Sequence, residues 1–233
     1  MATALLAVLW LMPLLRDTAT IISAPGQHLS LALADGSQVE LNAHTSLHTD
    51  FRYGRRHLRL DRGEAFFSVA KDPAHPFLLE TPRGTVRVTG TVFNVRLTSG
   101  DQPEVTLHEG SVRFETGAVA SIALAPGQQL AMDGPAFRVR DLLPTDLENL
   151  TAWRKGRLVL DGLTLAEAAG RLAEFNRRNP VQLAVGDPAL GAMRLSAAFR
   201  SDNVEGFVRL MESDFGMRAE WRSEREIVLR RAK

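Results

Sequence analysis

The sequence predicts an α+β protein: an N-terminal all-β domain, built as a curled sheet or a solenoid-like sandwich, followed by a small βαβ-βαβ domain. From about residue 20 to 140, short segments of alternating polar and apolar residues are separated by Gly, Pro and Asp, which is typical of strands and turns. After a polar stretch that contains Pro144, two segments have the apolar periodicity of helices. The 233 residues are enough for two domains that each bury a core of their own.

The chain begins with an apolar segment, residues 1–16. The run from Ala2 to Leu15 is 14 residues long and contains Pro13, whereas a helix that crosses a bilayer needs about 20 apolar residues. The segment has neither a basic beginning nor a clear cleavage site for a signal peptidase. We interpret residues 1–16 as part of a transmembrane segment; a hydrophobic helix of the core is the alternative.

Residues 17–145 form the predicted β domain, in which one pattern recurs. Each of four stretches contains L-x-x-G: residues 31–36, 58–67, 105–114 and 122–132. In the second and third stretches the match extends further, to an Ala or Val and then a Phe at equal spacing after the Gly. The pattern predicts a strand, a tight glycine turn and a second strand. Repeated hairpin-like units of this kind predict a core formed by stacked layers.

The stretch VRVTGTVFNVR changes its buried face partway along. Val86 and Val88 have one parity, whereas Phe93 and Val95 have the other. Because side chains alternate with a period of two along a strand, such a switch requires an extra residue, a bend or a corner. Glycine tolerates the backbone angles of a bend, so the sequence predicts a kink at the Gly90–Thr91 bond.

Residues 146–233 form the predicted C-terminal domain, with two helices. TLAEAAGRLAEFN begins at Thr164 and DNVEGFVRLMESDFG begins at Asp202, and each opens with a capping box and continues with an apolar stripe. Both contain E-x-x-x-R-L, which begins at Glu167 and at Glu205. Apolar strands flank each helix, so the sequence predicts two β-α-β units whose helices cover one face of one sheet.

The composition argues against several classes of function. Lys and Arg total 28 against 27 Asp and Glu, with the signs mixed along the chain, so nucleic acid is not an expected partner. The absence of cysteine excludes disulfides and thiolate metal sites. We interpret His44 and His48 as turn or surface residues rather than metal ligands. No catalytic motif is present, and the sequence predicts a binding module without a metal or cofactor.

The last hairpin is the candidate surface for a protein partner. An exposed sheet edge recruits a strand of another protein through main-chain hydrogen bonds, while alternate side chains give specificity. The candidate contact residues are Met217, Trp221, Ile227 and Leu229, with Trp221 as the anchor. The alternative for Trp221 is packing in the core of its own domain. Trp153, at the junction of the two domains, is expected in interdomain packing rather than in a partner contact.

A resemblance to a known family rests on four stretches of the β domain. DGSQVELNAHTSL, RHLRLDRGEAFFSVAKDPAHPFLLETPRG, VRVTGTVFNVR and VTLHEGSVRF follow in this order over residues 35–114. Together they resemble the FecR family of anti-sigma regulators in cell-surface signalling. From Trp153, with its lead-in WRKGRL, to about Leu229, the chain is similar to the short secretin and TonB N-terminus (STN) domain.

The resemblance implies a location and a set of partners. It implies a single-pass protein of the inner membrane, with residues from about 17 onward in the periplasm. The implied partners are the N-terminal signalling domain of a TonB-dependent outer-membrane transducer, usually for iron-chelate uptake, and an extracytoplasmic-function (ECF) sigma factor. In the family a cytoplasmic domain holds the sigma factor, and we expect that domain to be absent from this chain. Periplasmic and intramembrane proteases are implied as well; an envelope assembly module is the alternative function.

Some members of the family cleave themselves at a Gly-Thr bond, and the matching residues here are Gly90 and Thr91. The Thr91 hydroxyl would attack the preceding carbonyl and shift the acyl group from nitrogen to oxygen, after which water hydrolyses the ester. Asn94 is a candidate for polarising this site. The alternatives are that a strand corner alone explains Gly90, and that Asn94 is a turn residue or lies at the edge of a ladder.

Overall fold

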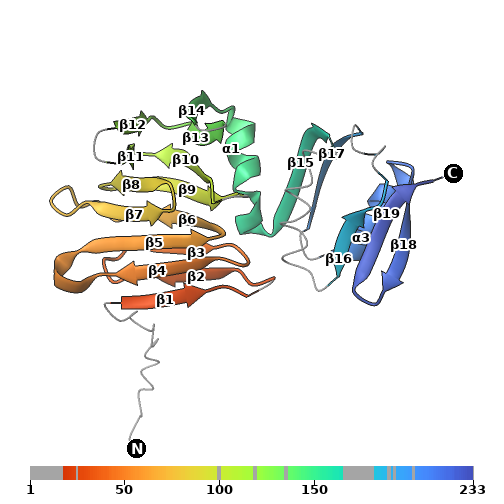
Figure 1. Cartoon of the computed structure of the whole chain (residues 1–233), viewed down its shortest axis with the longest axis horizontal. Coiled ribbons are helices and arrows are strands. Elements are labelled where there is room, and N and C mark those ends of the chain that lie inside the picture. The colour runs from red at the N-terminus through yellow and green to blue at the C-terminus, as the bar shows by residue number, and fades with distance from the viewer. Residues whose placement is uncertain are drawn as a thin grey trace, which may run out of the picture.

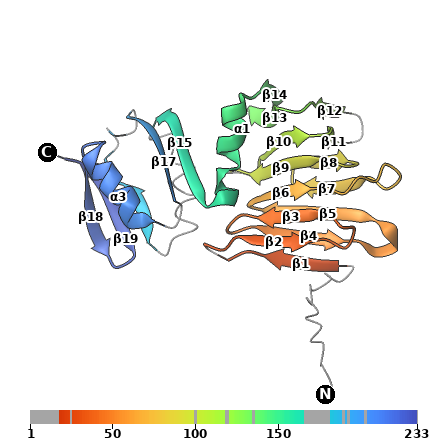
Figure 2. The same cartoon turned by 180° about the vertical axis from the view of Figure 1, so that it is seen from behind.

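The computed structural model describes residues 18–24, 26–98, 101–117, 120–133, 136–164, 181–187, 190, 193–200 and 203–232. Figure 1 shows two domains side by side: a large β sandwich, and a smaller domain that ends at the C-terminus. Helix α1 (Pro144–Leu150) and the 3₁₀ turn η2 (Ala152–Lys155) join them. Seen from behind, α1 again stands between the sandwich and the smaller domain (Figure 2).

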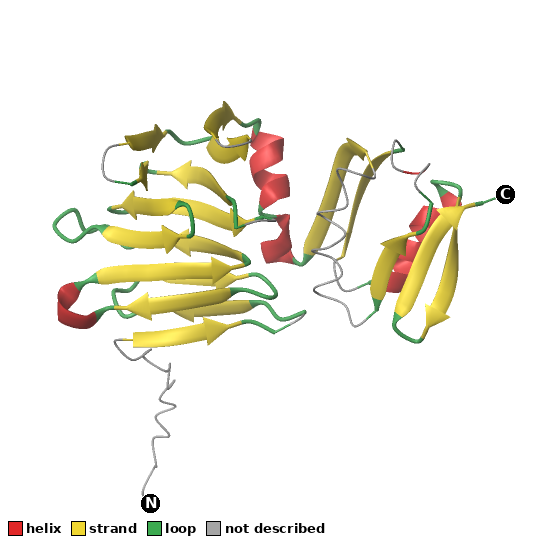
Figure 3. Ribbon diagram, in the orientation of Figure 1, coloured by secondary structure: helices red, strands yellow, loops and turns green. Residues whose placement is uncertain are grey.

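The sandwich consists of two seven-stranded sheets, and strands make up almost all of it (Figure 3). In pairing order, sheet 1 contains β1 (Thr18–Ile22), β4 (Ser46–Asp50), β5 (Arg56–Arg62), β7 (Phe77–Thr81), β8 (Gly84–Val88), β11 (Val112–Thr116) and β12 (Ala120–Leu124). Sheet 2 contains β14 (Ala136–Asp141), β13 (Gln128–Asp133), β10 (Pro103–Glu109), β9 (Val92–Leu97), β6 (Glu64–Ser68), β3 (Gln38–Leu41) and β2 (Leu29–Ala32). Within these two sheets, only β5 and β7 pair in parallel.

The two sheets bury their apolar faces against each other. Side chains alternate along each strand, so every second residue of a strand faces the interior. Phe67 on β6 stacks on Phe93 of the neighbouring strand, with ring centres 5.0 Å apart. It also meets Phe77 of the opposite sheet edge-on at 5.9 Å, and all three rings are fully buried. The structure thus confirms the β-rich fold that the alternating pattern predicts.

Three of the four predicted hairpin units do not pair their two strands within one sheet but cross from one sheet to the other. Gly63 lies between β5 and β6, Gly110 between β10 and β11, and Gly127 between β12 and β13, and in each case the two strands belong to opposite sheets. The first unit, around Gly36, is a true hairpin of β2 and β3. The prediction of hairpins is therefore wrong for three units. All four glycines have a positive φ, which suits a hairpin turn and a corner equally well, so the local pattern does not distinguish them.

The change of buried face around Gly90 is confirmed as a corner. β8 ends at Val88 in sheet 1, and β9 begins at Val92 in sheet 2. The chain crosses the sandwich between these strands, so its apolar side chains reach the same core from opposite sides. Gly90 has a φ of 151°, a conformation that L side chains rarely adopt.

The C-terminal domain contains two small sheets among its described strands. β15 (Arg157–Thr164) pairs antiparallel with β17 (Arg194–Arg200). β19 (Glu226–Arg231) lies between β16 (Gln182–Val185), which is parallel to it, and β18 (Met217–Ser223), which is antiparallel. The prediction of one sheet is therefore wrong for these five strands. The duplicated pattern predicts each strand but not its neighbour, because pairing depends on which strand edges meet in space.

Helix α3 (Val204–Ser213) confirms the second predicted helix. Its N-cap is Asn203 rather than Asp202, and the Asn203 Oδ1 accepts a hydrogen bond from the Gly206 amide at 2.8 Å. Phe207 and Met211 on the helix are fully buried and share one core with apolar side chains of both small sheets. The helix therefore holds the two sheets together.

Two predicted segments lie outside the described residues: the membrane segment at residues 1–16, and the first helix at residues 164–176 except for Thr164, the last residue of β15. Within the described part of the chain, no helix combines the length and the apolar character that crossing a bilayer requires.

A comparison of the corner glycine Gly63 with the hairpin glycine Gly36 tests whether Gly63 lies at a packed corner between the two sheets. A Cβ atom at Gly63 would lie 2.6 Å from the Thr45 Cα, whereas a Cβ at Gly36 would meet no atom within 4 Å. Both glycines have similar positive φ angles, 89° and 83°. We expect Gly36→Ala to cost about 1 kcal/mol of unfolding free energy from backbone strain alone, and Gly63→Ala to cost about 3 kcal/mol because overpacking is added. Urea unfolding followed by circular dichroism measures both; equal losses would contradict the assignment of Gly63 to a packed corner.

Candidate functional site

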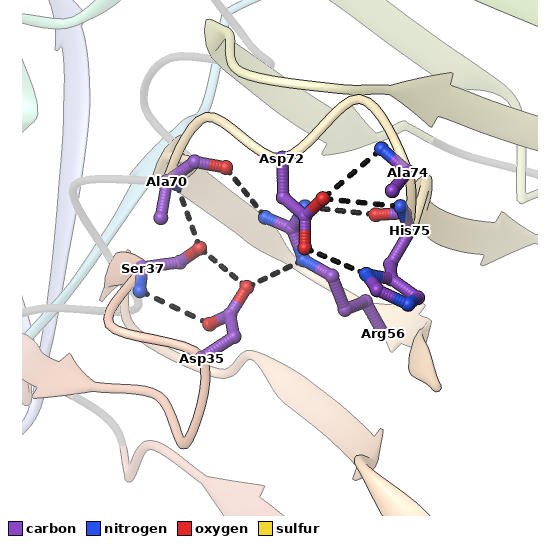
Figure 4. Close-up of polar contacts among 7 residues, drawn as sticks. All are labelled: Asp35, Ser37, Arg56, Ala70, Asp72, Ala74 and His75. Carbon is purple, nitrogen blue, oxygen red and sulfur yellow. Dashed lines mark hydrogen bonds and ion pairs between the residues drawn. The ribbon is translucent and has the colours of Figure 1, made fainter. Parts of the chain in front are cut away.

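A polar cluster surrounds the buried side chain of Arg56, the first residue of β5 (Figure 4). Its side chain is only 5% exposed. The guanidinium donates from Nε to Asp35 Oδ2 at 2.8 Å, from Nη1 to the His75 carbonyl at 2.9 Å and from Nη2 to the Ala70 carbonyl at 2.7 Å. Arg56 thus ties the turn after β2 to two points of the β6–β7 loop (residues 69–76), and its charge is balanced by Asp35.

Two further side chains complete this cluster. Ser37 donates its hydroxyl to Asp35 Oδ2 at 2.7 Å and accepts a hydrogen bond from the Ala70 amide at 2.9 Å. Asp72 accepts from the amides of Ala74 and His75 at 3.0 and 3.2 Å. A hydrogen bond from the His75 ring lowers the pKa of Asp72, which therefore stays ionised. Both ends of the β6–β7 loop are held by charged side chains.

The β6–β7 loop in turn clamps the Gly90 corner. The Val69 amide donates to the Thr91 carbonyl at 3.0 Å, and the Asp72 amide donates to the Thr89 carbonyl at 2.8 Å. Between them, a Cβ atom at Gly90 would lie only 2.9 Å from the Lys71 Cα. The Arg56 cluster and the Gly90–Thr91 corner are therefore connected through the β6–β7 loop. Because the loop is bonded to both, a shift of Arg56 would also move the corner.

The turn at Gly110 closes the opposite side of the corner. A Cβ atom at Gly110 would lie 2.8 Å from the Gly90 carbonyl oxygen, so the two glycines allow a close main-chain approach. The buried Thr91 hydroxyl donates to the Ser111 carbonyl at 3.0 Å. The structure thus places a hydroxyl next to the Gly90 peptide in a closely packed environment. Within the described residues, its one hydrogen-bond partner is that carbonyl, not a side chain that could accept its proton.

Contrary to the expectation, Asn94 does not lie at the Gly90–Thr91 bond but belongs to a buried polar cluster around Glu64. Its Nδ2 donates to Glu64 Oε1 at 2.9 Å, and the Asn42 Nδ2 donates to the other carboxylate oxygen at 2.8 Å. All three side chains are buried. Asn94 lies in β9, which has a neighbour on both sides, so neither a turn nor a ladder edge describes it. No hydrogen bond connects it to the Gly90–Thr91 bond in the described structure.

The predicted partner surface divides into one exposed and three buried residues. Met217, Ile227 and Leu229 lie in the core of the C-terminal domain, so their side chains are not accessible to a partner. Trp221 is 57% exposed, so the alternative that places it in the core is wrong. Its strand, β18, is an edge of the three-stranded sheet, whereas β19 is the central strand.

One exposed aromatic residue was not predicted from the sequence. Tyr53, in the 3₁₀ turn η1 (Arg52–Gly54), is 93% exposed and has left-handed angles, with φ 58° and ψ 32°. It lines a cavity of about 480 Å³ together with His57, His75 and Leu78. The positive φ of a non-glycine residue distinguishes Tyr53 in the structure, but no sequence motif predicts it.

The expected roles of two histidines agree with their positions. His44 lies in the turn between β3 and β4, and His48 lies on β4 with its ring 3.1 Å from the Thr20 hydroxyl. No group of three His, Cys, Asp or Glu side chains that could hold a metal ion occurs in the part of the chain that the structure describes.

The fold and its clusters define a two-domain, β-rich protein in which charged side chains hold main-chain segments in place. Residues 19–113, which run from β1 into β11, match the family model of FecR protein. No curated protein matches the chain.

Solved structures extend the likeness beyond the sandwich. Two crystal structures from Parabacteroides distasonis ATCC 8503, both described as a candidate anti-sigma factor, have a TM-score of 0.76 with this chain. They are 22% and 23% identical to it and cover 93% and 92% of it, with the whole of each compared chain aligned. At this identity the likeness establishes the fold of both domains.

The Arg56 cluster predicts a specific loss of stability. Arg56→Met removes the buried donor that Asp35 and two carbonyl groups of the β6–β7 loop share. Removing one partner of an ion pair whose side chains are 5% and 12% exposed costs about 3–5 kcal/mol of unfolding free energy. Arg59 on the same strand is the matched control, because its ion pair with Asp61 is 56% and 40% exposed. Arg59→Met should cost less than about 1 kcal/mol. Similar urea midpoints for the two variants would show that the buried cluster does not hold the β6–β7 loop.

Proposed function

We propose that this protein is the periplasmic part of an anti-sigma regulator in cell-surface signalling. The observation that carries the proposal is the FecR match of residues 19–113. The fold shared with two structures described as a candidate anti-sigma factor supports it further. In this role the chain belongs to the inner membrane, residues from about 17 onward lie in the periplasm, and the protein controls an ECF sigma factor. Periplasmic and intramembrane proteases would end the regulator's control by cleaving it.

The partner that we propose for the periplasmic part is the N-terminal signalling domain of a TonB-dependent transducer, with iron-chelate uptake as the regulated process. The edge strand β18 offers a surface for it. The Ala219 amide donates to Glu212 Oε1 of α3 at 3.1 Å, so this N–H group points away from β19. Because the direction alternates along an antiparallel strand, the Trp221 main chain also faces the open side. A partner strand would pair there and pack on the exposed indole ring.

Trp221→Ala tests this surface. We expect about 30-fold weaker binding of a candidate signalling domain, the loss of about 2 kcal/mol typical of an interface hot spot. Tyr53→Ala is the control, because it removes an even more exposed aromatic side chain, and removes it from the sandwich. Isothermal titration calorimetry measures both affinities. Absence of any complex at tens of micromolar would count against the transducer partner, and equal losses in the two variants would count against β18 as the surface.

An envelope assembly module is the second candidate function, because the sequence from Trp153 to about Leu229 resembles an STN domain, a domain that secretins also contain. The two roles differ in stoichiometry. Light scattering after size-exclusion chromatography should show a monomer that forms a one-to-one complex if the protein is a regulator, and higher self-assemblies if it is an assembly module.

Self-cleavage at Gly90–Thr91 remains part of the proposal. The Thr91 oxygen attacks the Gly90 carbonyl carbon, the C–N bond breaks, and the hydroxyl proton passes to the released amine; water then hydrolyses the ester. The buried hydroxyl next to a glycine in a rare conformation supports this chemistry. Because β8 and β9 pair with other strands, the two fragments would stay together in the fold.

Denaturing electrophoresis of the purified protein tests the cleavage. We expect two fragments from the wild type and from Thr91→Ser, which keeps a hydroxyl, and one intact chain from Thr91→Ala. A single intact band in all three samples would end the cleavage proposal, and it would leave the corner role of Gly90 untouched.

A further inference from the structure

The segment that joins the two domains is attached to the sandwich by more than its chain connection. This junction segment (residues 142–155) contains α1 and η2. At its start, the Leu142 amide donates to the Gly127 carbonyl at 2.8 Å, which continues the main-chain contacts of β14 with β13. At its end, two adjacent side chains of η2, Trp153 and Arg154, reach sheet 2.

Arg154 makes two kinds of contact with sheet 2. Its Nε donates to Glu40 Oε1 at 2.9 Å, and its Nη2 donates to the same oxygen. The guanidinium carbon also lies 3.6 Å from the centre of the Phe66 ring. Glu40 is on β3 and Phe66 is opposite it on β6, so one side chain spans two neighbouring strands. The two side chains of the ion pair are 34% and 20% exposed, which shields this contact from solvent more than a typical surface pair.

Trp153 adds an apolar contact beside this ion pair. The indole is buried and meets the His28 ring edge-on, with ring centres 5.4 Å apart. His28 also places its Nε2 3.3 Å from the second oxygen of Glu40. Glu40 is therefore the common partner of a residue of the junction segment and a residue of the sandwich.

The C-terminal domain begins immediately after these contacts. Gly156 ends η2 with a φ of 66°, and a Cβ atom there would meet nothing within 4 Å. From Leu158 onward, the buried side chains belong to the separate core of the C-terminal domain. A cavity of about 280 Å³ lies at this point, lined by Glu40 of the sandwich and by Arg157 and Val159 of β15. The two domains are thus not closely packed next to Gly156, which leaves room for rotation.

We infer that Arg154, Glu40, Trp153 and His28 form a latch that sets the orientation of the C-terminal domain on the sandwich, with Gly156 as the pivot. While the latch is closed, the junction segment is part of the sandwich, and the mechanical boundary lies at Gly156 rather than at residues 145–146. When Arg154 leaves Glu40, η2 lifts from sheet 2 and the C-terminal domain turns about Gly156. Interfaces between domains of one chain are small enough that such motion is the ordinary outcome once a specific contact is lost.

The absence of cysteine makes a distance measurement straightforward. Two spin labels would be attached to cysteines introduced at Arg113 on β11 and Arg218 on β18, both exposed and one in each domain. Pulsed electron spin resonance on the full chain gives the distribution of distances between them. We expect one narrow distribution in the otherwise wild-type protein, and a distribution about twice as wide, or displaced, in both Arg154→Gln and Glu40→Gln.

Arg87→Gln is the matched control for the latch. Arg87 pairs with Glu115 at 2.7 Å inside sheet 1, and these side chains are 40% and 32% exposed, close to the values for Arg154 and Glu40. This variant should keep the wild-type distribution. The latch is overturned if the wild type is already broad, if either Arg154→Gln or Glu40→Gln keeps the wild-type distribution, or if Arg87→Gln broadens it as much. The measurement needs no transducer, so its outcome is independent of the proposed partner.

Discussion

A chain that builds two facing sheets must cross repeatedly from one to the other, and each crossing requires a sharp change of backbone direction where the strands are most closely packed. Glycine meets this constraint here. Gly63, Gly90 and Gly110 all have positive φ angles, and a Cβ atom at any of them would meet main-chain atoms of a neighbouring segment at 2.6–2.9 Å. These three corners are therefore fixed by sterics and not only by turn propensity, whereas a Cβ atom at the corner glycine Gly127 would meet nothing within 4 Å. The continuous core between the sheets depends on these crossings, because they bring strands distant in sequence into register.

The polar clusters follow from the same constraint. A corner leaves main-chain groups without ladder partners in a place that water does not reach, and such groups need other donors and acceptors. Arg56 supplies three donors to this end of the sandwich, and two of them go to carbonyl groups of the β6–β7 loop. That loop then satisfies the carbonyls on either side of Gly90. The buried guanidinium of Arg56 thus holds main-chain segments in position.

The local features of the fold could be predicted from the sequence, whereas the long-range ones could not. The parity change at Gly90 predicts a corner because alternation is a property of neighbouring residues. The apolar stripe of α3 is local in the same sense, although the N-cap is Asn203 rather than the predicted Asp202. In contrast, Gly63 and Gly110 have the same pattern as a hairpin, since the sequence does not show which sheet receives the next strand. The partners of Arg56 come from two other segments, and Asn94 donates to a carboxylate 30 residues away, so no spacing rule identifies either cluster.

Among the described residues, the two exposed large aromatic side chains lie in different domains, which gives the junction a role in any communication between the domains. Trp221 is on an edge strand of the C-terminal domain, and Tyr53 is on a turn of the sandwich next to the Arg56 cluster. A partner bound at β18 changes only the C-terminal domain unless the contact between the domains resists rotation. Glu40 provides that resistance, because its carboxylate is held from the sandwich by His28 and from η2 by Arg154. On the latch that we infer, force applied to β18 reaches sheet 2 through this ion pair and the neighbouring contacts of Trp153 and Phe66, and their combined strength decides whether the domains move together or apart.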